Sequence, residues 1–593
     1  MIRTVLDIAA LSVVQSPSCA RYTTALTMKF LIIGSLLIGQ TLGLLNLTQI
    51  SFTKLSSCED NNGNVQTGMF RYGAARAAFH ASNRMLYVIG RPVANNRKDG
   101  CLRIYNGLSS NTPTLQLSMQ FENPLDGELL SIAVCDTRVA LSFAGVNTVS
   151  EGHVQLYHPF SLGDATLNEM TTGRVAVGPY PKHMAFTSDC EKLVVANEGI
   201  PGVINDVLVD PDGEVSIVTR DVGGLTTAKE IPFTIVNGAN TNTYINRGVR
   251  YVYQGEQGFP NTFSNDLEPE FVAISSDDSK AFVVLQENNA MAVIDLETND
   301  GALVDIYSFG ERDWRNFQLD ASDTDKAANH GFYDLYSFPQ PRVMLATQLN
   351  GQDFVITANT GARKSFNHGT AGSFTEGTRL STLWRDNDIN RLMFSNEMAA
   401  AIQDNNKIGR LYASENDGKG NTGLIEKLYF YGTRDLGMFI VNSTGIVRQF
   451  TTGDEMERSA VQYYGPVFNG DTTNGNLQPI AEMDTRSDDM GPEPRALAGG
   501  LFGNSDFPFV IAGTRNGILY TYTLRTGNPA LESLYRAGNM EGTWNSLYIN
   551  DQTGDNVIND MGTIEKNILT TNPFIYVVSE ASGSFSIYEV KEV

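Results

Sequence analysis

Clusters of basic residues are missing from this chain of 593 residues. Its 43 lysines and arginines are outnumbered by 66 aspartates and glutamates, and the formal net charge is −23. A field of this sign repels nucleic acids and anionic membranes and attracts cations. We therefore expect no nucleic-acid partner.

The sequence also lacks the short motifs of several enzyme classes. It has no G-x-S-x-G turn for a nucleophilic serine, no G-x-x-x-x-G-K loop for phosphates and no H-E-x-x-H pair for zinc. Its six histidines are scattered along the chain. These absences argue against a nucleophilic hydrolase, and the expectation leans away from an enzyme.

Long apolar stretches are scarce. The clearest run, FLIIGSLLIGQTLG, follows Met28-Lys29 and is too short to be a comfortable membrane span. Thr41 and Gly43 fit a cleavage site, so we assign residues 28–43 to a signal peptide. Residues 1–27 then form an upstream extension, with a transit peptide as the alternative. The C-terminal SFSIYEVKEV has no apolar tail, so we expect neither a lipid anchor nor a transmembrane segment.

The sequence does contain a recurring pattern of short strands, clearest in residues 267–296, LEPEFVAISSDDSKAFVVLQENNAMAVIDL. Phe271–Ser275, Ala281–Leu285 and Met291–Leu296 have the composition of strands and are separated by turn residues. Asn288-Asn289 suits a tight hairpin because asparagine tolerates positive φ. Three or four strands in a recurring unit are typical of a propeller blade.

Seven such units follow one another. They begin at Ala74, Leu129, Tyr180, Leu267, Pro339, Gly491 and Ile564. One unit cannot bury both faces of its sheet, so the units must pack on their neighbours. We predict an all-β, seven-bladed β-propeller-like domain over residues 44–593, with a stacked pair of β-sandwiches as the alternative. The strand at Leu47–Leu55 would pair with the last unit and close the ring.

Two long loop insertions interrupt the spacing of the units, at about 223–265 and 362–422. The first is rich in glycine, asparagine and threonine. The second carries Trp384-Arg385-Asp386 and a helix-like stretch at Arg391–Ile408. Long insertions in a repeat array usually lie on one face and often carry function.

Cysteine is rare, with five residues, and Cys19 would leave with the leader. Cys135 and Cys190 fall in the same turn region of consecutive units, so we expect them to pair. Cys58 and Cys101 then remain for a second disulfide. Disulfides indicate an oxidising compartment, which agrees with secretion.

Several blocks of the sequence carry a family resemblance. They are VANEG, DPDGEVSIV, LEPEFVAIS with QENNAMAVIDL, LDASD, TRSDDMGPEP and SEASGSFSIYEV, in this order from about Gly73 to the C-terminus. Together they resemble the mesenchyme-specific cell-surface glycoprotein family, which shares the choice-of-anchor I domain with bacterial extracellular proteins. The resemblance implies a propeller-like β domain and, in animals, an extracellular glycoprotein of skeleton-forming cells and calcified matrices. Some bacterial relatives are described as alkaline-phosphatase-like.

Acidic loops are the best candidates for a metal site. Four carboxylates lie within ten residues, at Asp484, Asp488, Asp489 and Glu493. Calcium takes six to eight oxygen ligands, which such a loop can supply. Two further acidic groups lie at 206–214 and at Asp320, Asp323 and Asp325. The alternative is turn chemistry, in which aspartate bonds to local backbone.

The innermost strand of each blade should border a central channel, and the residue after its proline should approach that channel. We expect Glu270 there as a further metal ligand. Its counterparts, predicted to line the channel, are Arg76, Lys182, Arg342, Arg495 and Glu565. The family resemblance implies mostly acidic residues here, whereas four of these six are basic. The ring would then be a salt-bridged plug, an anion site for carbonate, phosphate or sulfate, or plain ion pairs. His183, beside Lys182, is the best histidine ligand, with a packed core residue as the alternative.

These patterns predict a secreted, extracellular-matrix protein. We expect an acidic glycoprotein of a mineralised (shell or skeletal) matrix that binds calcium and matrix proteins or a mineral surface without catalysis. Sequons for glycosylation begin at Asn46 and Asn442. The alternative is a metal-dependent phosphoesterase.

Overall fold

The computed structural model describes residues 45–60, 63–71, 73–91, 100–122, 127–253, 261–298, 300–442, 444–502, 507–524 and 527–592. These residues belong to one unit, 45–592. The predicted upstream extension and signal peptide lie outside the described residues.

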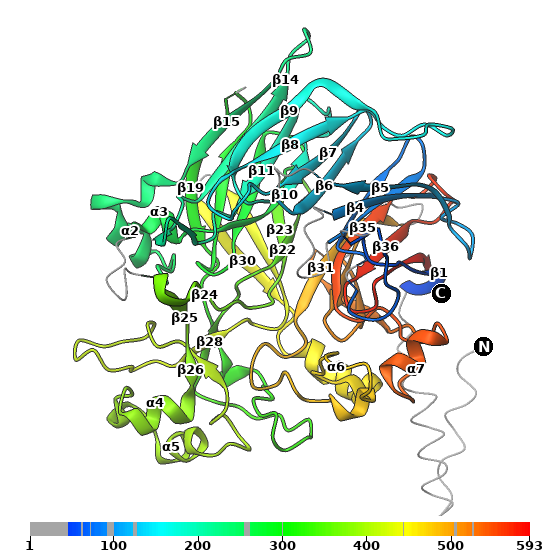
Figure 1. Cartoon of the computed structure of the whole chain (residues 1–593). Coiled ribbons are helices and arrows are strands. Elements are labelled where there is room, and N and C mark those ends of the chain that lie inside the picture. Colours follow the sequence, from blue (N-terminus) through cyan, green and yellow to red (C-terminus); the bar gives the residue numbers. More distant parts are fainter. Residues whose placement is uncertain are drawn as a thin grey trace, which may run out of the picture. The chain divides into compact units, whose positions relative to one another are not determined.

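Seven sheets of the described chain each contain four antiparallel strands, and we number them blades 1 to 7 (Figure 1). Blades 1 and 2 consist of β2 (Arg76–His80), β3 (Met85–Gly90), β4 (Gly100–Asn106) and β5 (Thr114–Phe121), then β6 (Leu129–Cys135), β7 (Arg138–Phe143), β8 (Glu151–Tyr157) and β9 (Glu169–Pro179). Blades 3 and 4 consist of β10 (Pro181–Phe186), β11 (Lys192–Asn197), β14 (Glu214–Arg220) and β15 (Thr226–Pro232), then β16 (Pro269–Ile274), β17 (Lys280–Leu285), β18 (Ala290–Asp295) and β19 (Ala302–Ser308).

The remaining blades follow the same order, except that the last one takes its outer strand from the start of the described chain. Blades 5 and 6 consist of β22 (Val343–Leu349), β23 (Gln352–Ala358), β29 (Leu436–Asn442) and β30 (Gly445–Thr451), then β31 (Pro494–Phe502), β32 (Phe507–Thr514), β33 (Leu519–Thr523) and β34 (Ala530–Tyr535). Blade 7 consists of β35 (Ile558–Ile564), β36 (Phe574–Ser579), β37 (Ser584–Glu592) and β1 (Leu45–Lys54).

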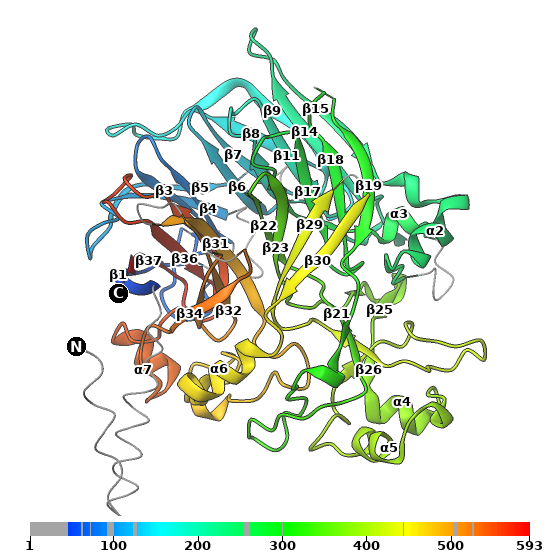
Figure 2. The ribbon, with the colours of Figure 1, turned by 180° about the vertical axis from the view of Figure 1, so that it is seen from behind.

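The first strands of the seven blades contact one another in a closed order, β2, β6, β10, β16, β22, β31, β35 and again β2. This is the arrangement of a β-propeller, seen from behind in Figure 2. The predicted closing strand is confirmed, because β1 pairs antiparallel with β37 from Leu45 opposite Glu592 to Lys54 opposite Ser584. The hydrogen bonds of β1 cover the edge that blade 7 would otherwise leave open.

The second strand of blade 4, β17, is deeply buried on both faces. Ala281–Leu285 is a continuous apolar run in which all five side chains are fully buried. One face of β17 packs with blade 3, where Val194, Ala196 and Val215 lie in the same core cluster. The other face packs with blade 5 through Phe282 and Val284. Burial on both faces explains the absence of alternation.

The insertions differ in part from the prediction. The first contains β15, which is the fourth strand of blade 3 and therefore not part of an excursion. The rest of it folds as η1 (Thr234–Val236), η2 (Gly238–Asn240), α2 (Thr241–Asn246) and α3 (Phe263–Asp266). The second begins with a hairpin and continues through two helices; its elements are β24 (Ser365–Asn367), η5 (Gly369–Ala371), β25 (Ser373–Thr375), β26 (Thr378–Arg379), α4 (Leu380–Asp386), η6 (Arg391–Met393), α5 (Asn396–Gln403) and β27 (Tyr412–Ala413). The α-helix within the predicted stretch 391–408 is thus α5 alone.

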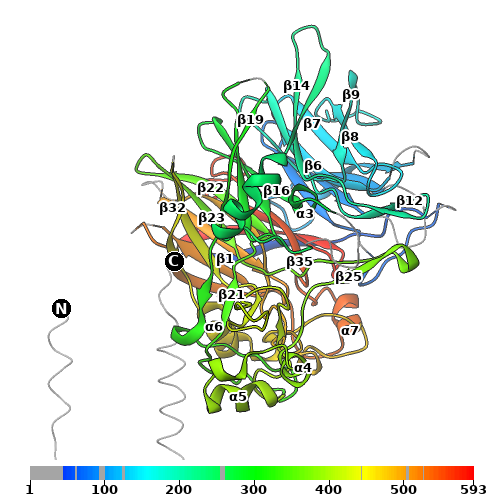
Figure 3. The same ribbon diagram turned by 90° about the vertical axis from the view of Figure 1, so that its left-hand side faces the viewer.

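Further segments join the second insertion beyond the blades. They comprise β20 (Arg312–Asp313), η4 (Trp314–Asn316), β21 (Tyr336–Phe338), β28 (Tyr429–Tyr431), α6 (Glu455–Tyr464), η7 (Gly465–Val467), η8 (Pro479–Ala481) and α7 (Trp544–Ile549). β20, β21, β28, β27 and β26 form a five-stranded sheet, and β12 (Gly202–Ile204) pairs with β13 (Val207–Val209). In all three views α4, α5, α6 and α7 lie on the same side of the blades (Figures 1 to 3).

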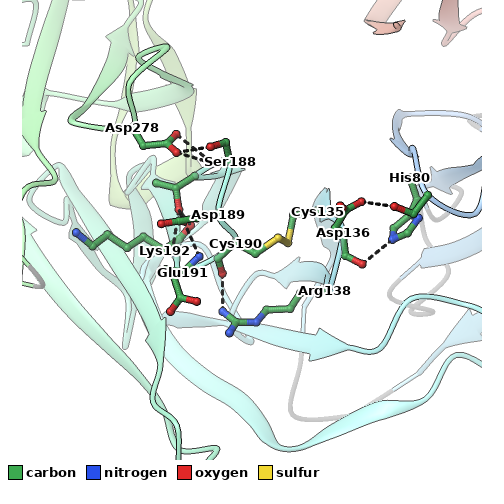
Figure 4. The surroundings of a disulfide bond; sticks show 12 residues. His80, Cys135, Asp136, Arg138, Ser188, Asp189, Cys190, Glu191, Lys192 and Asp278 are labelled. Carbon is green, nitrogen blue, oxygen red and sulfur yellow. Dashed lines mark hydrogen bonds between the residues drawn. A yellow bond between two sulfur atoms is a disulfide. The ribbon is translucent and has the colours of Figure 1, made fainter. Parts of the chain in front are cut away.

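Both predicted disulfides are confirmed. Cys58 bonds to Cys101, and Cys135 at the end of β6 bonds to Cys190 in the turn between β10 and β11. The second bond joins blades 2 and 3 beside a hydrogen bond of 2.6 Å from Arg138 to the Cys190 carbonyl (Figure 4). Ser188 donates to Asp278 from the same turn and so extends the connection to blade 4.

Among the described residues, no helix has both the length and the apolar composition needed to cross a membrane.

Candidate functional site

The first strands of five blades carry a register shift that releases one residue from the strand pairing. The released residues are Leu130, Lys182, Glu270, Arg495 and Asn559. A bulge of this kind redirects a side chain and is common beside functional sites. Four of these side chains are polar or charged, so the bulges bring polar groups to the centre of the ring.

Three of the five bulges, and also Arg342, follow a residue with positive φ. Tyr180, Gln340, Glu493 and Val557 have positive φ, between 45° and 56°. Each lies two residues before Lys182, Arg342, Arg495 or Asn559, and proline separates the first three pairs. The residue with positive φ turns the chain, and proline fixes the next φ, so the following side chain meets the channel.

Blades 3 and 4 form an acidic sector of the channel, composed of Glu198, Glu270 and Glu287 around Lys182. The Lys182 Nζ pairs with Glu198 Oε1 and lies 2.8 Å from Glu270 Oε2. Burial opposes charge on Lys182, yet Glu198 and Glu270 raise its pKa above the ordinary value. Three carboxyl groups therefore share one ammonium group.

Proton sharing resolves the excess negative charge. Burial, together with the neighbouring Glu270 and Glu268 carboxylates, raises the pKa of Glu287 far above its usual range. A hydrogen bond between the carboxyl groups of Glu287 and Glu270 raises the pKa of Glu287 and lowers that of Glu270, which favours the proton on Glu287. Burial alone would raise the pKa of Glu270 too, but Lys182 and this hydrogen bond hold it below the usual value. Burial raises the pKa of Glu198 to about 7, against the opposing effect of Lys182.

Blades 5, 6, 7 and 1 form a basic sector, composed of Arg76, Arg342, Arg495 and Asn559. The Asn559 Oδ1 accepts hydrogen bonds from Arg342 Nη2 at 2.8 Å and from Arg495 Nη2 at 3.4 Å. Its amide nitrogen donates to the Ala75 carbonyl at 2.8 Å. Blades 5 and 7 are not neighbours in the ring, so the contact between Arg342 and Asn559 places both side chains at its centre.

The guanidinium groups of this sector repel one another. Burial lowers the pKa of Arg76, of Arg342 and of Arg495, the last to about 9, and Arg342 adds to the effect on Arg495. Two positive charges about 6 Å apart cost roughly 3 kcal/mol at an effective dielectric constant of about 20. Arg495 has one carboxylate partner, Glu493 at 3.2 Å, which Arg486 and Arg515 share. Neither Arg76 nor Arg342 forms an ion pair within the described part of the chain.

The predicted channel residues are thus brought together, with one exception. Glu565 is exposed in the turn after β35 and does not reach the channel. The prediction placed the first strand of blade 7 too late, because Ile558–Ile564 contains three polar residues and a glycine and does not look like a buried strand. Asn559 takes its position. Glu198 and Glu287, which follow the second strands of their blades, were also not predicted.

His183 packs in the core, as the alternative interpretation of the sequence expected. Its ring stacks on Phe271 with centroids 4.0 Å apart, and its Nδ1 accepts a hydrogen bond from the Val272 amide at 3.2 Å. Burial holds its pKa well below the usual value, so the ring is neutral.

Three of the five predicted metal ligands form ion pairs with arginine. Asp488 pairs with Arg379 and Arg410, and Asp489 lies 3.1 Å from both Arg363 and Arg486. Glu493 has the three arginine partners given above, and Glu270 belongs to the acidic sector. Within the described residues, no three His, Cys, Asp or Glu side chains are arranged to hold a metal ion. Asp484, by contrast, forms no ion pair among the described residues, and metal binding by these five residues stays a prediction.

Two acidic groups that are distant in sequence do meet beside these arginines. Asp484 is fully buried, accepts a hydrogen bond of 2.6 Å from Ser487, and leaves its Oδ2 without a partner. Burial raises the pKa of Asp484 to about 7, and Asp325 contributes to the rise. Burial, with Glu457 and Asp484 nearby, likewise raises the pKa of Asp320 to about 8. Sequence spacing gave no sign of this convergence.

The chain matches a known protein family. The family model described as "Choice-of-anchor I domain" matches residues 75–527. The mesenchyme-specific cell surface glycoprotein of Strongylocentrotus purpuratus is 26% identical over 362 residues, which cover 55% of this chain and 46% of that protein. Gigasin-3a of Magallana gigas is 27% identical over 199 residues, or 32% of this chain and 67% of that protein. The match thus spans about half the length of the sea-urchin relative.

Solved structures are more distant. The β-propeller domain of Cps50 (Swd1) from Myceliophteria thermophila covers 92% of this chain and 99% of its own, with 8% identity and a TM-score of 0.40. The propeller fold is established by the strand order given above and not by this similarity.

Proposed function

The chain belongs to the choice-of-anchor I domain family, and from this membership we propose that it is a secreted, non-catalytic acidic glycoprotein of an extracellular or mineralised matrix. Its curated relatives include a protein named as a cell surface glycoprotein. Two disulfide bonds suit an oxidising compartment. The asparagines of both sequons, Asn46 and Asn442, are exposed, as glycosylation requires.

The non-catalytic part of the proposal rests on the ion pairs that the channel carboxylates form with lysine and arginine. A metal-dependent phosphoesterase needs converging carboxylates that are free to bind a cation. Here Glu198 and Glu270 bind Lys182, and Glu493 is shared by three arginines. Each would have to give up an ion pair before it could bind a metal.

Calcium binding, in this proposal, belongs to the outer surface. Buried side chains include 14 acids and eight bases, so most of the acidic excess lies on less buried residues or outside the described chain. Dispersed exposed carboxylates bind calcium weakly, in the millimolar range typical of extracellular sites, and the attraction is screened by salt. Matrix proteins or a mineral surface would be the partners of such a surface.

The test is calorimetric titration of the full secreted chain with calcium, together with an assay for aryl phosphate hydrolysis with added divalent ions. We expect several weak calcium sites whose heat declines as sodium chloride rises from about 0.01 to 0.5 M, and no turnover. Turnover that disappears in Asp488→Ala and Glu493→Ala would contradict the proposal. Failure to bind calcium at millimolar concentration would remove the calcium role.

A further inference from the structure

Two arginines of the basic sector have side-chain donors that form no hydrogen bond with the described protein. Arg76 and Arg495 are 9% and 8% exposed, and the Nε of each is buried without a hydrogen-bond partner. A buried donor without a partner is unfavourable and is rare in folded proteins. These donors belong to the first strands of blades 1 and 6, which flank blade 7, so the deficit is concentrated on one side of the ring.

The acceptor that Arg342 and Arg495 share is neutral. Both guanidinium groups donate to the Asn559 Oδ1, which carries only the partial charge of an amide. The fork of a guanidinium group matches oxoanions, which accept two parallel hydrogen bonds from it. An amide oxygen therefore stands where two cations would bind an anion more strongly.

Carboxylates face this sector, but within the described chain none forms an ion pair with Arg76 or Arg342. Asp560 opposes the lowering of the Arg76 pKa and accepts hydrogen bonds from the backbone amides of Ala77 and Met561, at 2.8 and 3.0 Å. Glu270 is engaged with Lys182. Glu580 acts on Arg342 and Arg495 from beyond ion-pair distance. Within the described chain, two of the three arginines thus have no carboxylate of their own, and the third shares one.

We propose that Arg76, Arg342 and Arg495 form a site for a small inorganic oxoanion, of the class of phosphate, sulfate or bicarbonate. The anion would accept hydrogen bonds from guanidinium donors that the protein leaves unused and would offset the repulsion among the three cations. Arg342 is only half-buried, so the site is accessible to a small ion. This inference does not depend on the proposed matrix role, because it rests on the charges of the channel alone.

The experiment is calorimetric titration of the full chain with sulfate, phosphate and bicarbonate in turn, against chloride at equal ionic strength. We expect saturable binding of at least one oxoanion, and the order of affinities then identifies the anion. Arg342→Gln should weaken binding by about tenfold or more, as expected for loss of a charged hydrogen bond. Arg315→Gln is the control, because it removes the same charge from an exposed side chain that pairs with Asp313.

Two results would overturn the proposal. One is the absence of saturable binding by all three oxoanions in the wild-type chain at low ionic strength. The other is equal affinity in Arg342→Gln and Arg315→Gln, which would place the anion on the outer surface. The thermal unfolding midpoint of each variant in chloride, with circular dichroism, shows that the comparison concerns folded protein. Arg342→Lys, which keeps the charge and loses the fork, should bind with intermediate affinity if the guanidinium geometry matters.

Discussion

Blades 3 and 4 bring carboxylates to the channel and cover them with a lysine, whereas blades 5, 6 and 1 bring arginines, two of which have no carboxylate of their own. The backbone device is the same in both sectors: a bulge at the start of the first strand, with Lys182 and Glu270 on one side and Arg495 and Asn559 on the other. The acidic sector is internally compensated, and the basic sector is not. The fold therefore fixes where the channel residues lie, and the identity of each residue decides whether that part of the channel is acidic or basic.

The largest effect should follow from removing the one cation of the acidic sector. Lys182→Met leaves the buried Glu198 and Glu270 without their cation, so we expect a loss of about 3–5 kcal/mol in the free energy of unfolding. Chemical denaturation measures it. Lys54→Met is the control: Lys54 pairs with the mostly exposed Asp551 and should cost about 1 kcal/mol or less. Equal losses in the two variants would show that the acidic sector is not compensated by Lys182.

Two glutamates of the same sector should respond differently to the same change. Glu270→Gln removes a charged partner of Lys182, and we expect it to cost about 1.5–3 kcal/mol. Glu287→Gln replaces a protonated carboxyl with a neutral amide, so its cost should stay below about 1 kcal/mol at pH 7. Denaturation of both variants at pH 7 measures the difference. A larger loss for Glu287→Gln would mean that Glu287, and not Glu270, carries the negative charge.

Stability should fall as the pH rises from 5 to 8. The folded pKa of Glu198, about 7, lies above the ordinary value of 4.5, so the folded state binds the proton more tightly than the unfolded state does. This stabilisation is complete below about pH 4.5 and is lost as the pH rises through 7, by about 2–3 kcal/mol between pH 5 and 8. Glu270, with its lowered pKa, titrates below this window. Unfolding free energy measured across the range should show a smaller slope in Glu198→Gln; an unchanged slope would assign the effect to other groups.

The smallest effect should come from the basic sector. Arg342→Gln removes a cation without an ion pair and relieves its repulsion toward Arg76 and Arg495. In chloride we expect the unfolding free energy to change by less than about 1 kcal/mol, or to rise, in contrast to Lys182→Met. Thermal unfolding in chloride checks this. A loss comparable with that of Lys182→Met would mean that Arg342 has a compensating partner and that the two sectors do not differ.

Much of the fold could be predicted because blades have local signals. The strands around Phe271–Leu296, the closing strand near Leu47 and both disulfides follow from alternation, turn residues and cysteine position. The first strand of blade 7 could not be located, because INDMGTI is held by neighbours on both sides and not by its own pattern. Likewise β15 contains Lys229 and Glu230 and is partly exposed, so its composition is that of a loop.

The site was predictable in position more than in chemistry. Proline before Lys182, Glu270, Arg342 and Arg495 identified the channel residues. Whether a carboxylate there binds a metal or a lysine depends on which side chains arrive from other blades, as Glu198 and Glu287 do. The same holds for Asp488 and Glu493, whose arginine partners come from residues 379, 410, 486, 495 and 515. One sequence does not reveal such distant pairings.

The uncompensated basic sector is tested most directly by anomalous diffraction from crystals soaked in selenate, which resembles sulfate and contains an anomalous scatterer. The account predicts a selenium peak within hydrogen-bond distance of the guanidinium groups of Arg76, Arg342 and Arg495. The absence of a peak in the channel, at a selenate concentration that saturates binding in solution, would contradict it.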